Sequence, residues 1–139
     1  MSLWLLDSDH LSLQERGHPV LRKRLAAVSP ESIAVSVVTV EETLRGRLAL
    51  LARRTSGEPR IHAYQKLMET VRFFSSIPVV HFDSECERKY QELCALRLRV
   101  GSQDLRIAAS ALAKNMTVVT RNMKHFGRVP DLLLEDWTV

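Results

Sequence analysis

The chain has 139 residues, of which 45% are hydrophobic and 26% charged, so its composition fits one domain with a packed core and excludes wholesale disorder. Its formal net charge of +4 is compatible with a polyanionic partner such as nucleic acid, although many proteins with this charge have none. No apolar run approaches the roughly 20 residues of a membrane span, and the first residues turn acidic at Asp7 instead of forming a signal peptide, so we expect a cytoplasmic protein.

The first predicted element is a strand at residues 3–6. All four residues are apolar, which is typical of a strand buried on both faces in a parallel sheet covered by helices. Asp7 follows at the carboxyl end, where open α/β sheets bind ligands. A buried carboxylate needs a partner, which a divalent cation can supply. The alternative is that Asp7 only caps the next helix.

The rest of the chain alternates between predicted helices and strands. Runs rich in β-branched residues predict strands at 33–38, 77–82 and 117–120, and a short edge strand is expected at 132–134. Apolar residues at helical spacing predict helices at 10–16, 20–28, 39–56, 61–74, 84–98 and 103–114. This order predicts right-handed crossovers and a parallel sheet between two helical layers.

The two cysteines, Cys86 and Cys94, lie eight residues apart on one predicted helix. That spacing corresponds to a rise of about 12 Å, beyond the roughly 7 Å that a disulfide spans. We expect two buried, reduced thiols, as in the cytoplasm. Their spacing matches no metal site.

Polar side chains follow several predicted strands at the points where those strands end. In addition to Asp7, these are Glu41 or Glu42 after the second strand, Asp104 at the start of the last long helix, and Asn122 after the fourth strand. Because these positions converge on one edge of a parallel sheet, the side chains are expected to lie together. Oxygen ligands of this kind suit Mg²⁺ or Mn²⁺.

Each of these residues also has a purely structural interpretation. Thr39 and Glu42 fit a capping box, in which Glu42 closes the start of the helix. Ser102 and Asp104 fit the start of the next helix, where an acid is favoured by the helix dipole. The helical phase does not decide between Glu41 and Glu42.

Four segments carry a resemblance to a known family: LLDSD, SVVTVEETLRG, RVGSQDLRIAASALA and VVTRNMKHFGRVPDLLLEDW. They resemble the PIN-domain ribonucleases, specifically the VapC-type toxins of VapBC toxin–antitoxin systems, in the right order and over nearly the whole chain. The resemblance implies an α/β fold, a three-layer α/β/α arrangement with a central, mainly parallel sheet of four to five strands. Residues 1–139 would form a single PIN domain, with a helical hairpin at about 39–76 inserted between strands two and three.

The same resemblance implies a set of site residues. Asp7, Glu42, Asp104 and Asn122 match the catalytic positions, and the first three match ligands of Mg²⁺ or Mn²⁺. Glu42 is chosen because it lies four residues before Gly46. Many relatives have Asp where Asn122 stands, so the number of metal ions, one or two, stays open.

Two further positions near this set also differ from the family's usual pattern. His125 stands where relatives often have Asp. Asp9 ranks below the four catalytic residues, because relatives often have Asn or another polar residue there.

By resemblance, the activity is metal-dependent endonucleolytic cleavage of RNA by an activated water molecule, leaving a 5′-phosphate and a 3′-hydroxyl. The expected partners are RNA, a cognate antitoxin and a second copy of the chain. The helix at 61–74 is a candidate protein-binding surface, although such a stripe is also typical of a core. Four cations near the acids are candidates for holding phosphates, with ordinary exposed or ion-paired cations as the alternative: Arg45, Arg106, Arg121 and Lys124.

Two rival functions remain at this point. Asp7-x-Asp9 after an apolar strand is the nucleophile and acid pair of haloacid-dehalogenase-like phosphatases, but no clear Lys and acidic pair follows it later in the sequence. The other rival is a catalytically inactive PIN-like module that binds RNA or a partner, which Asn122 keeps open.

Overall fold

The computed structural model describes residues 3–53 and 56–139 of the chain. Its strands are β1 (Trp4–Leu6), β2 (Ile33–Ser36), β3 (Val79–Val80), β4 (Thr117–Val119) and β5 (Leu134–Glu135). Its helices are α1 (Ser8–Glu15), α2 (Pro19–Ala26), α3 (Val37–Arg53), α4 (Gly57–Ser76), α5 (Ser84–Ala95), α6 (Ser102–Ala113) and α7 (Met123–Phe126), with a 3-10 turn, η1 (Pro30–Ser32), before β2.

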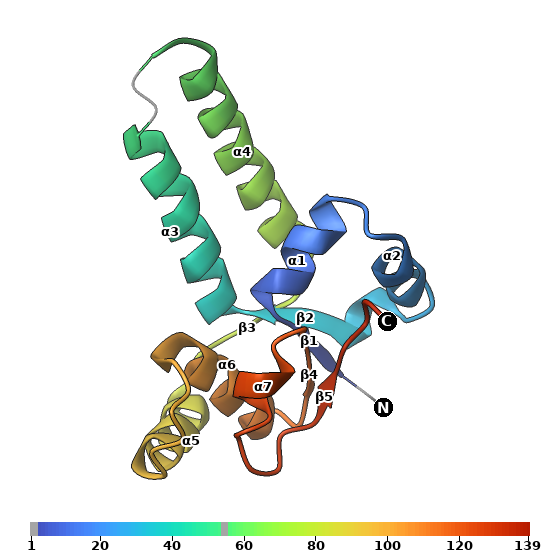
Figure 1. Cartoon of the computed structure of the whole chain (residues 1–139), viewed down its shortest axis with the longest axis vertical. Helices are drawn as coiled ribbons and strands as arrows, with labels where there is room; N and C mark the ends of the chain where they lie inside the picture. Colours follow the sequence, from blue (N-terminus) through green and yellow to red (C-terminus); the bar gives the residue numbers. More distant parts are fainter. Residues whose placement is uncertain (1–2, 54–55) are drawn as a thin grey trace.

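The five strands form one parallel sheet in the order β3-β2-β1-β4-β5. This confirms the expected α/β class. The chain moves outward from β1 to β2 and β3, and then returns to the other side of β1 to add β4 and β5 (Figure 1). The strand order therefore reverses at β1, and the carboxyl ends of β1 and β4 border the crevice where such sheets bind ligands.

Alternating residues of the central strands face two separate helical layers. Leu5, Ala34 and Val118 belong to one buried cluster with residues of α5 and α6. Leu6 and Val119 belong to a second cluster with residues of α1 and α2. Figure 1 shows these two helix pairs on opposite sides of the sheet. The two-residue period of a strand thus produces the three-layer α/β/α arrangement.

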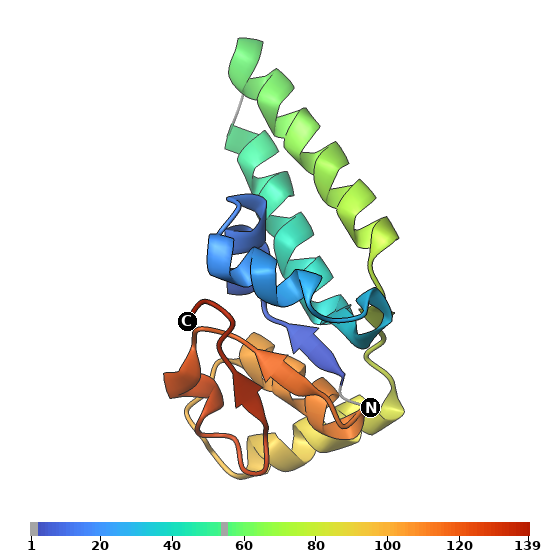
Figure 2. The same ribbon diagram turned by 90° about the vertical axis from the view of Figure 1, so that its right-hand side faces the viewer.

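Helices α3 and α4 lie side by side and extend away from the sheet in both views (Figures 1 and 2). α3 starts at Val37, two residues earlier than expected, and the Ser36 hydroxyl oxygen accepts a hydrogen bond from the Val38 N–H (3.0 Å). Gly57 was expected to mark the end of this helix, but it begins α4 with a φ of 67° that favours glycine. Residues 54 and 55 of the expected helix lie outside the described part. None of the described helices is both long and apolar enough to cross a membrane.

Three further expectations need correction. α5 ends at Ala95, before the expected Leu98, because Arg97 adopts the left-handed conformation (φ 52°) that terminates helices. Cys94 is exposed, whereas Cys86 is buried as expected, and both are free thiols. A short helix, α7, follows β4 where no helix was predicted; its fully buried Phe126 anchors it in the core.

Candidate active site

Asp7 lies at the switch point of the sheet. Its backbone N–H donates to the Val119 carbonyl at the end of β4 (2.9 Å), and its side chain is only 4% exposed. Its Oδ1 accepts a hydrogen bond from the Ser8 N–H (2.8 Å), and its Oδ2 accepts one from the Thr120 hydroxyl (3.0 Å). Asp7 therefore caps α1 and also places a carboxylate at the crevice, so the two interpretations of this residue are compatible.

The register of α3 separates the two adjacent glutamates. Glu41 is exposed and bonds to Arg45 on its own helix and to Gln103 on α6. Glu42 turns inward, and its Oε1 is buried without a hydrogen-bond partner among the described residues. The structure therefore places Glu42, and not Glu41, beside Asp7.

The capping box expected at Thr39 and Glu42 is absent. Because α3 already begins at Val37, Thr39 lies inside the helix instead of at its cap. The Thr39 hydroxyl oxygen is fully buried and, like Glu42 Oε1, has no partner among the residues that the structure describes. A buried polar atom without a partner is costly, which marks a position where a ligand or water can bind.

Asp104 lies in the first turn of α6, which packs against α3. The cap expected from Ser102 is not formed: Gly101 occupies the N-cap position, and no side chain bonds there. Asp104 is half-buried, and the helix dipole favours its negative charge. It therefore reaches the crevice from the α5–α6 side, whereas Glu42 reaches it from α3.

Burial and mutual repulsion raise the pKa of all three carboxyl groups. Burial, and then the charge of Asp9, raise the pKa of Asp7 to about 6, with a smaller contribution from Asp104. Burial also raises the pKa of Glu42, followed by the charges of Asp7 and Asp104. For Asp104, burial raises the pKa and Asp9 adds to the effect, while His125 opposes it. Carboxylates from three separate elements thus lie within one another's electrostatic field.

The described residues contain no group of three or more His, Cys, Asp or Glu side chains already arranged as metal ligands. The donor chemistry nevertheless fits a hard divalent cation. The donors are oxygens, one of them lacks a partner, and the repulsion that raises each pKa is what a cation would relieve. Mg²⁺ uses one or two carboxylates and keeps several waters, so a closed cage of side chains is not required.

Asn122 lies at the rim of this site and caps α7. Its carboxamide oxygen accepts from the His125 N–H (3.4 Å), and its Nδ2 lies 3.1 Å from the His125 Nδ1. Its backbone N–H donates to the Thr120 hydroxyl oxygen (2.9 Å). The side chain is therefore engaged within α7, and the backbone of Asn122 is linked to Asp7 through the Thr120 hydroxyl.

Sequence reasoning missed Thr120 as a site residue. Its side chain is fully buried and connects Asp7 to the backbone of Asn122. The available signal was its position: it follows a buried strand at the same sheet edge as Asp7.

The four cationic side chains proposed to hold phosphates differ in whether they already have a partner within the chain. Arg45 pairs with Glu41, while Arg106 donates to Gln103 Oε1 (2.6 Å) and lies over the Tyr90 ring. By contrast, two exposed side chains form no ion pair within residues 3–53 and 56–139: Arg121 and Lys124.

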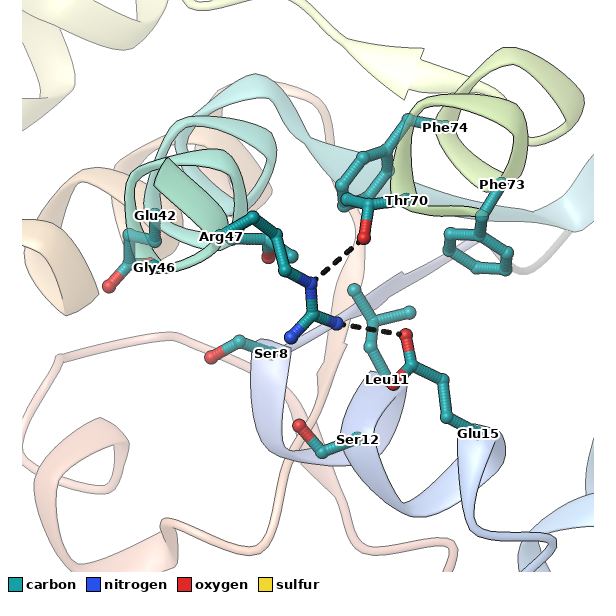
Figure 3. A pocket seen from close by; sticks show the side chains of 11 residues that line it. Ser8, Leu11, Ser12, Glu15, Glu42, Gly46, Arg47, Thr70, Phe73 and Phe74 are labelled. Carbon is teal, nitrogen blue, oxygen red and sulfur yellow. Dashed lines mark hydrogen bonds and ion pairs between the residues drawn. The ribbon is translucent and has the colours of Figure 1, made fainter. Parts of the chain in front are cut away.

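A cavity of about 270 Å³ adjoins the acids between α1, α3 and α4 (Figure 3). Glu42 and Gly46 line it from α3, and Phe73 and Phe74 line it from α4. Arg47 crosses it, donating to the Thr70 hydroxyl oxygen (2.9 Å) and pairing with a carboxylate on α1, that of Glu15 (3.4 Å). The cavity therefore has an apolar wall on one side, and Glu42 lines both the cavity and the acidic crevice.

A sequence model of the PIN domain family matches residues 5–132 of the chain. Among curated proteins, ribonuclease VapC2 of Rickettsia felis is 41% identical over 69 residues, which cover 47% of this chain and 52% of that protein. Ribonuclease VapC1 of Haemophilus influenzae is 26% identical over 141 residues, covering 98% of both chains.

Among solved structures, the chain is similar to DNA-bound VapBC from Salmonella typhimurium. The TM-score is 0.80 at 25% sequence identity, and the match covers 99% of both chains. The fold and the family match thus agree over nearly the whole length.

Proposed function

The chain belongs to the PIN domain family, and we propose that it is an endoribonuclease, the toxin of a VapBC-type toxin–antitoxin pair. The observation that carries the proposal is that Asp7, directly after β1, lies near Glu42 of α3 and Asp104 of α6 at the switch point of the sheet, with the pKa of each raised. Perturbed carboxylates in a crevice are typical of catalytic sites. The relatives named as ribonucleases support RNA as the substrate.

We propose Mg²⁺ or Mn²⁺ as the cofactor, held by Asp7, Glu42 and Asp104. The support is the oxygen-only donor set and the partnerless Glu42 Oε1. When bound, such an ion polarises a phosphodiester and makes a coordinated water molecule more acidic.

The chain's own residues contribute position and proton transfer. Asp7 is held by two donors, so its carboxylate is oriented before substrate binds. Glu42 has a free buried oxygen and a raised pKa, which suits a group that orients the attacking water and accepts its proton. Asn122 positions the rim of the site by capping α7.

We assign the RNA phosphates first to Arg121 and Lys124, because these side chains are exposed and follow Thr120, whose hydroxyl donates to Asp7. Arg45 and Arg106 rank below them, since each already has a partner within the chain. The salt dependence of RNA binding measures such contacts directly.

The contacts of Asp9 argue against the phosphatase alternative. One carboxylate oxygen lies 2.8 Å from His10 Nδ1, and the other accepts from the Arg121 N–H (3.1 Å). An acid held in this way is poorly placed to protonate a leaving group. The inactive binding module remains an outcome of the test below.

We propose the cavity beside Glu42 as the site where a segment of the antitoxin binds. It combines an aromatic wall from α4 with the carboxylate of Glu42, whereas Glu15 is already paired with Arg47, so it suits a segment with apolar side chains and a basic side chain directed at Glu42. Four α4 side chains are also exposed and available for a protein partner or a second copy: Ile61, Tyr64, Met68 and Val71. The size of the purified protein, alone and with the antitoxin, tests both.

We further propose that residues 1–139 form a single PIN domain with the hairpin at about 39–76 as its insertion, and that the protein works in the cytoplasm. The two unpaired thiols support a reducing compartment.

The test is RNA cleavage by the purified protein with Mg²⁺ or Mn²⁺ and with a chelator. We expect cleavage that needs the metal and that falls about 10²-fold or more in Asp7→Asn and Glu42→Gln. The matched controls are Asp131→Asn, at an exposed left-handed residue (φ 65°) that Asn tolerates, and Glu41→Gln on the outer face of α3. Wild-type rates in Asp7→Asn would remove the site, and folded, metal-bound protein without cleavage would favour the inactive module.

A further inference from the structure

A second polar network lies behind the acids and is centred on His10. This side chain of α1 is fully buried. Its Nε2 accepts a hydrogen bond from the Trp137 N–H (3.2 Å), and its Nδ1 lies 2.8 Å from Asp9 Oδ1. Because Nε2 accepts, the ring proton belongs on Nδ1, which donates to Asp9. Both ring nitrogens are therefore satisfied, one by the neighbouring Asp9 and the other by Trp137 near the end of the chain.

Asp9 continues this network into the segment after β4. Its Oδ2 accepts a hydrogen bond from the Arg121 N–H (3.1 Å) and lies 3.4 Å from the Thr120 hydroxyl. The same hydroxyl donates to Asp7 Oδ2 and accepts from the Asn122 N–H. The buried imidazole is thus connected with Asp7 through Asp9, the backbone of Arg121 that Asp9 holds, and the adjacent Thr120 whose hydroxyl donates to Asp7.

The segment at 135–137 holds the other end of the network rigidly. Trp137 is 2% exposed and packs edge-on against Trp4 of β1, with ring centroids 5.4 Å apart. The Glu135 carbonyl accepts from the Thr120 N–H (2.9 Å) in the β4–β5 ladder. His10 is therefore fixed between two parts of the sheet that do not move independently.

We propose that His10 and Asp9 are positioning residues that brace segment 120–122, and through Thr120 the carboxylate of Asp7, in the geometry needed for cleavage. Neither side chain contacts the substrate. The brace works because the Asp9 carboxylate, held by His10 on one oxygen, accepts the Arg121 N–H on the other. This contact fixes the adjacent Thr120, whose hydroxyl donates to Asp7. The effect on catalysis rests on the proposed function, whereas the effect on segment 120–122 does not.

Two substitutions of His10 each keep one of its two hydrogen bonds and remove the other. In His10→Asn, the carboxamide N–H replaces Nδ1 and donates to Asp9, but it does not reach Trp137. In His10→Gln, the carboxamide reaches the position of Nε2 and accepts from Trp137, but it leaves Asp9 without its donor. Both variants lose one bond and a similar ring volume, so we expect similar losses of thermal stability.

The first measurement is amide hydrogen exchange in metal-free protein. We expect the Arg121 amide to exchange about tenfold faster in His10→Gln, because the bond to a charged acceptor is loosened, and His10→Asn to restore most of the protection. Asp9→Ala, at a side chain that is 34% exposed, should lose the same protection without leaving a cavity. His62→Gln, on the exposed side of α4, is the matched control and should change nothing.

The second measurement is RNA cleavage at saturating Mg²⁺. We expect kcat to fall about tenfold in His10→Gln while KM for RNA stays within about threefold, and His10→Asn to recover most of the loss. Equal losses in both variants, in proportion to thermal stability, would show that His10 only fills space and would overturn the proposal. Unchanged Arg121 exchange in His10→Gln would also overturn it. Absence of cleavage by the wild-type protein would instead refute the proposed function, and amide exchange would still decide the brace.

Discussion

Asp7 performs two tasks that are usually given to different residues. As the N-cap of α1, it satisfies the Ser8 N–H, and as a buried acid at the switch point it lies in the field of other carboxylates. Only one of its oxygens serves the cap, since Oδ2 faces Thr120. The folded protein therefore keeps a carboxylate whose ionisation is unfavourable unless a cation is near.

The raised pKa of Asp7 makes a prediction about pH. An acid whose pKa is higher in the folded state than in the unfolded state stabilises the fold at low pH, and this stability is lost as pH rises through the folded-state pKa. For Asp7 the pKa rises from 3.8 to about 6, so the metal-free protein should lose about 2 kcal/mol of unfolding free energy between pH 4 and pH 7. Urea denaturation in a chelator measures this change.

The control for this prediction is Asp7→Asn, which lacks the titrating group and should lose most of the pH slope. Adding Mg²⁺ at pH 7 should restore stability in the wild-type protein and much less in the variant. The same slope in both proteins would contradict the assignment of the shift to Asp7.

At the scale of elements, the junction of β2 and α3 decides which acid faces the crevice. α3 begins directly after the strand, and this early start places Glu42 inward and Glu41 outward. The same register brings Gly46, one turn later, to the wall of the cavity beside Glu42. The residue at which α3 begins thus determines both which glutamate faces the crevice and which side chains line the adjoining cavity.

Gly46 offers a test of this arrangement. An added Cβ would meet no atom within 4 Å, and glycine in a helix interior costs about 0.5–1 kcal/mol relative to alanine. Gly46→Ala should therefore raise the melting temperature by about 2–5 °C, measured by circular dichroism without a partner. Because the methyl group would stand in the wall of the cavity, it should also weaken antitoxin binding.

Gly57→Ala is the contrasting control on the neighbouring helix. Gly57 has a φ of 67°, a conformation that costs alanine about 1 kcal/mol or more. Gly57→Ala should therefore lower the melting temperature, whereas Gly46→Ala should raise it. A fall in both variants would mean that position 46 is not an unstrained helical site.

At the scale of the whole molecule, one sheet couples two helical layers. Leu5 faces α5 and α6, whereas Leu6 faces α1 and α2. The two tryptophans, Trp4 and Trp137, belong to the α1–α2 side, so their fluorescence reports on that layer. Circular dichroism reports on helices in both layers.

Leu5→Ala tests whether the two layers unfold together. Leu5 is fully buried, so the substitution should cost about 2–5 kcal/mol. If the chain is one cooperative domain, the tryptophan fluorescence midpoint should fall together with the circular dichroism midpoint, although the cavity forms on the other side of the sheet. Leu133→Ala, at a side chain that is 67% exposed, should shift neither. Separate midpoints for the two probes would show that the layers unfold independently.

The layers and most of the sheet follow from the amino-acid pattern. Apolar strands with β-branched residues and amphipathic helices between them specify a parallel sheet under helices, because each pattern can be buried in only one way. The acid after the first strand followed from the same logic. What the pattern could not fix were element ends: α3 starts at Val37 and α7 exists because of packing and local hydrogen bonds.

Which polar groups meet follows from the packing of distant elements. Helical periodicity does not separate Glu41 from Glu42, whereas the packing of α3 against α6 turns Glu41 toward Gln103 and leaves Glu42 Oε1 buried. The sequence also gave no sign that Thr120 would bond Asp7, or that His10 would link Trp137 to Asp9. The contacts of Thr120 with Asp7 and of Trp137 with His10 join residues more than a hundred positions apart, and they depend on how the strands are ordered, which no local pattern encodes.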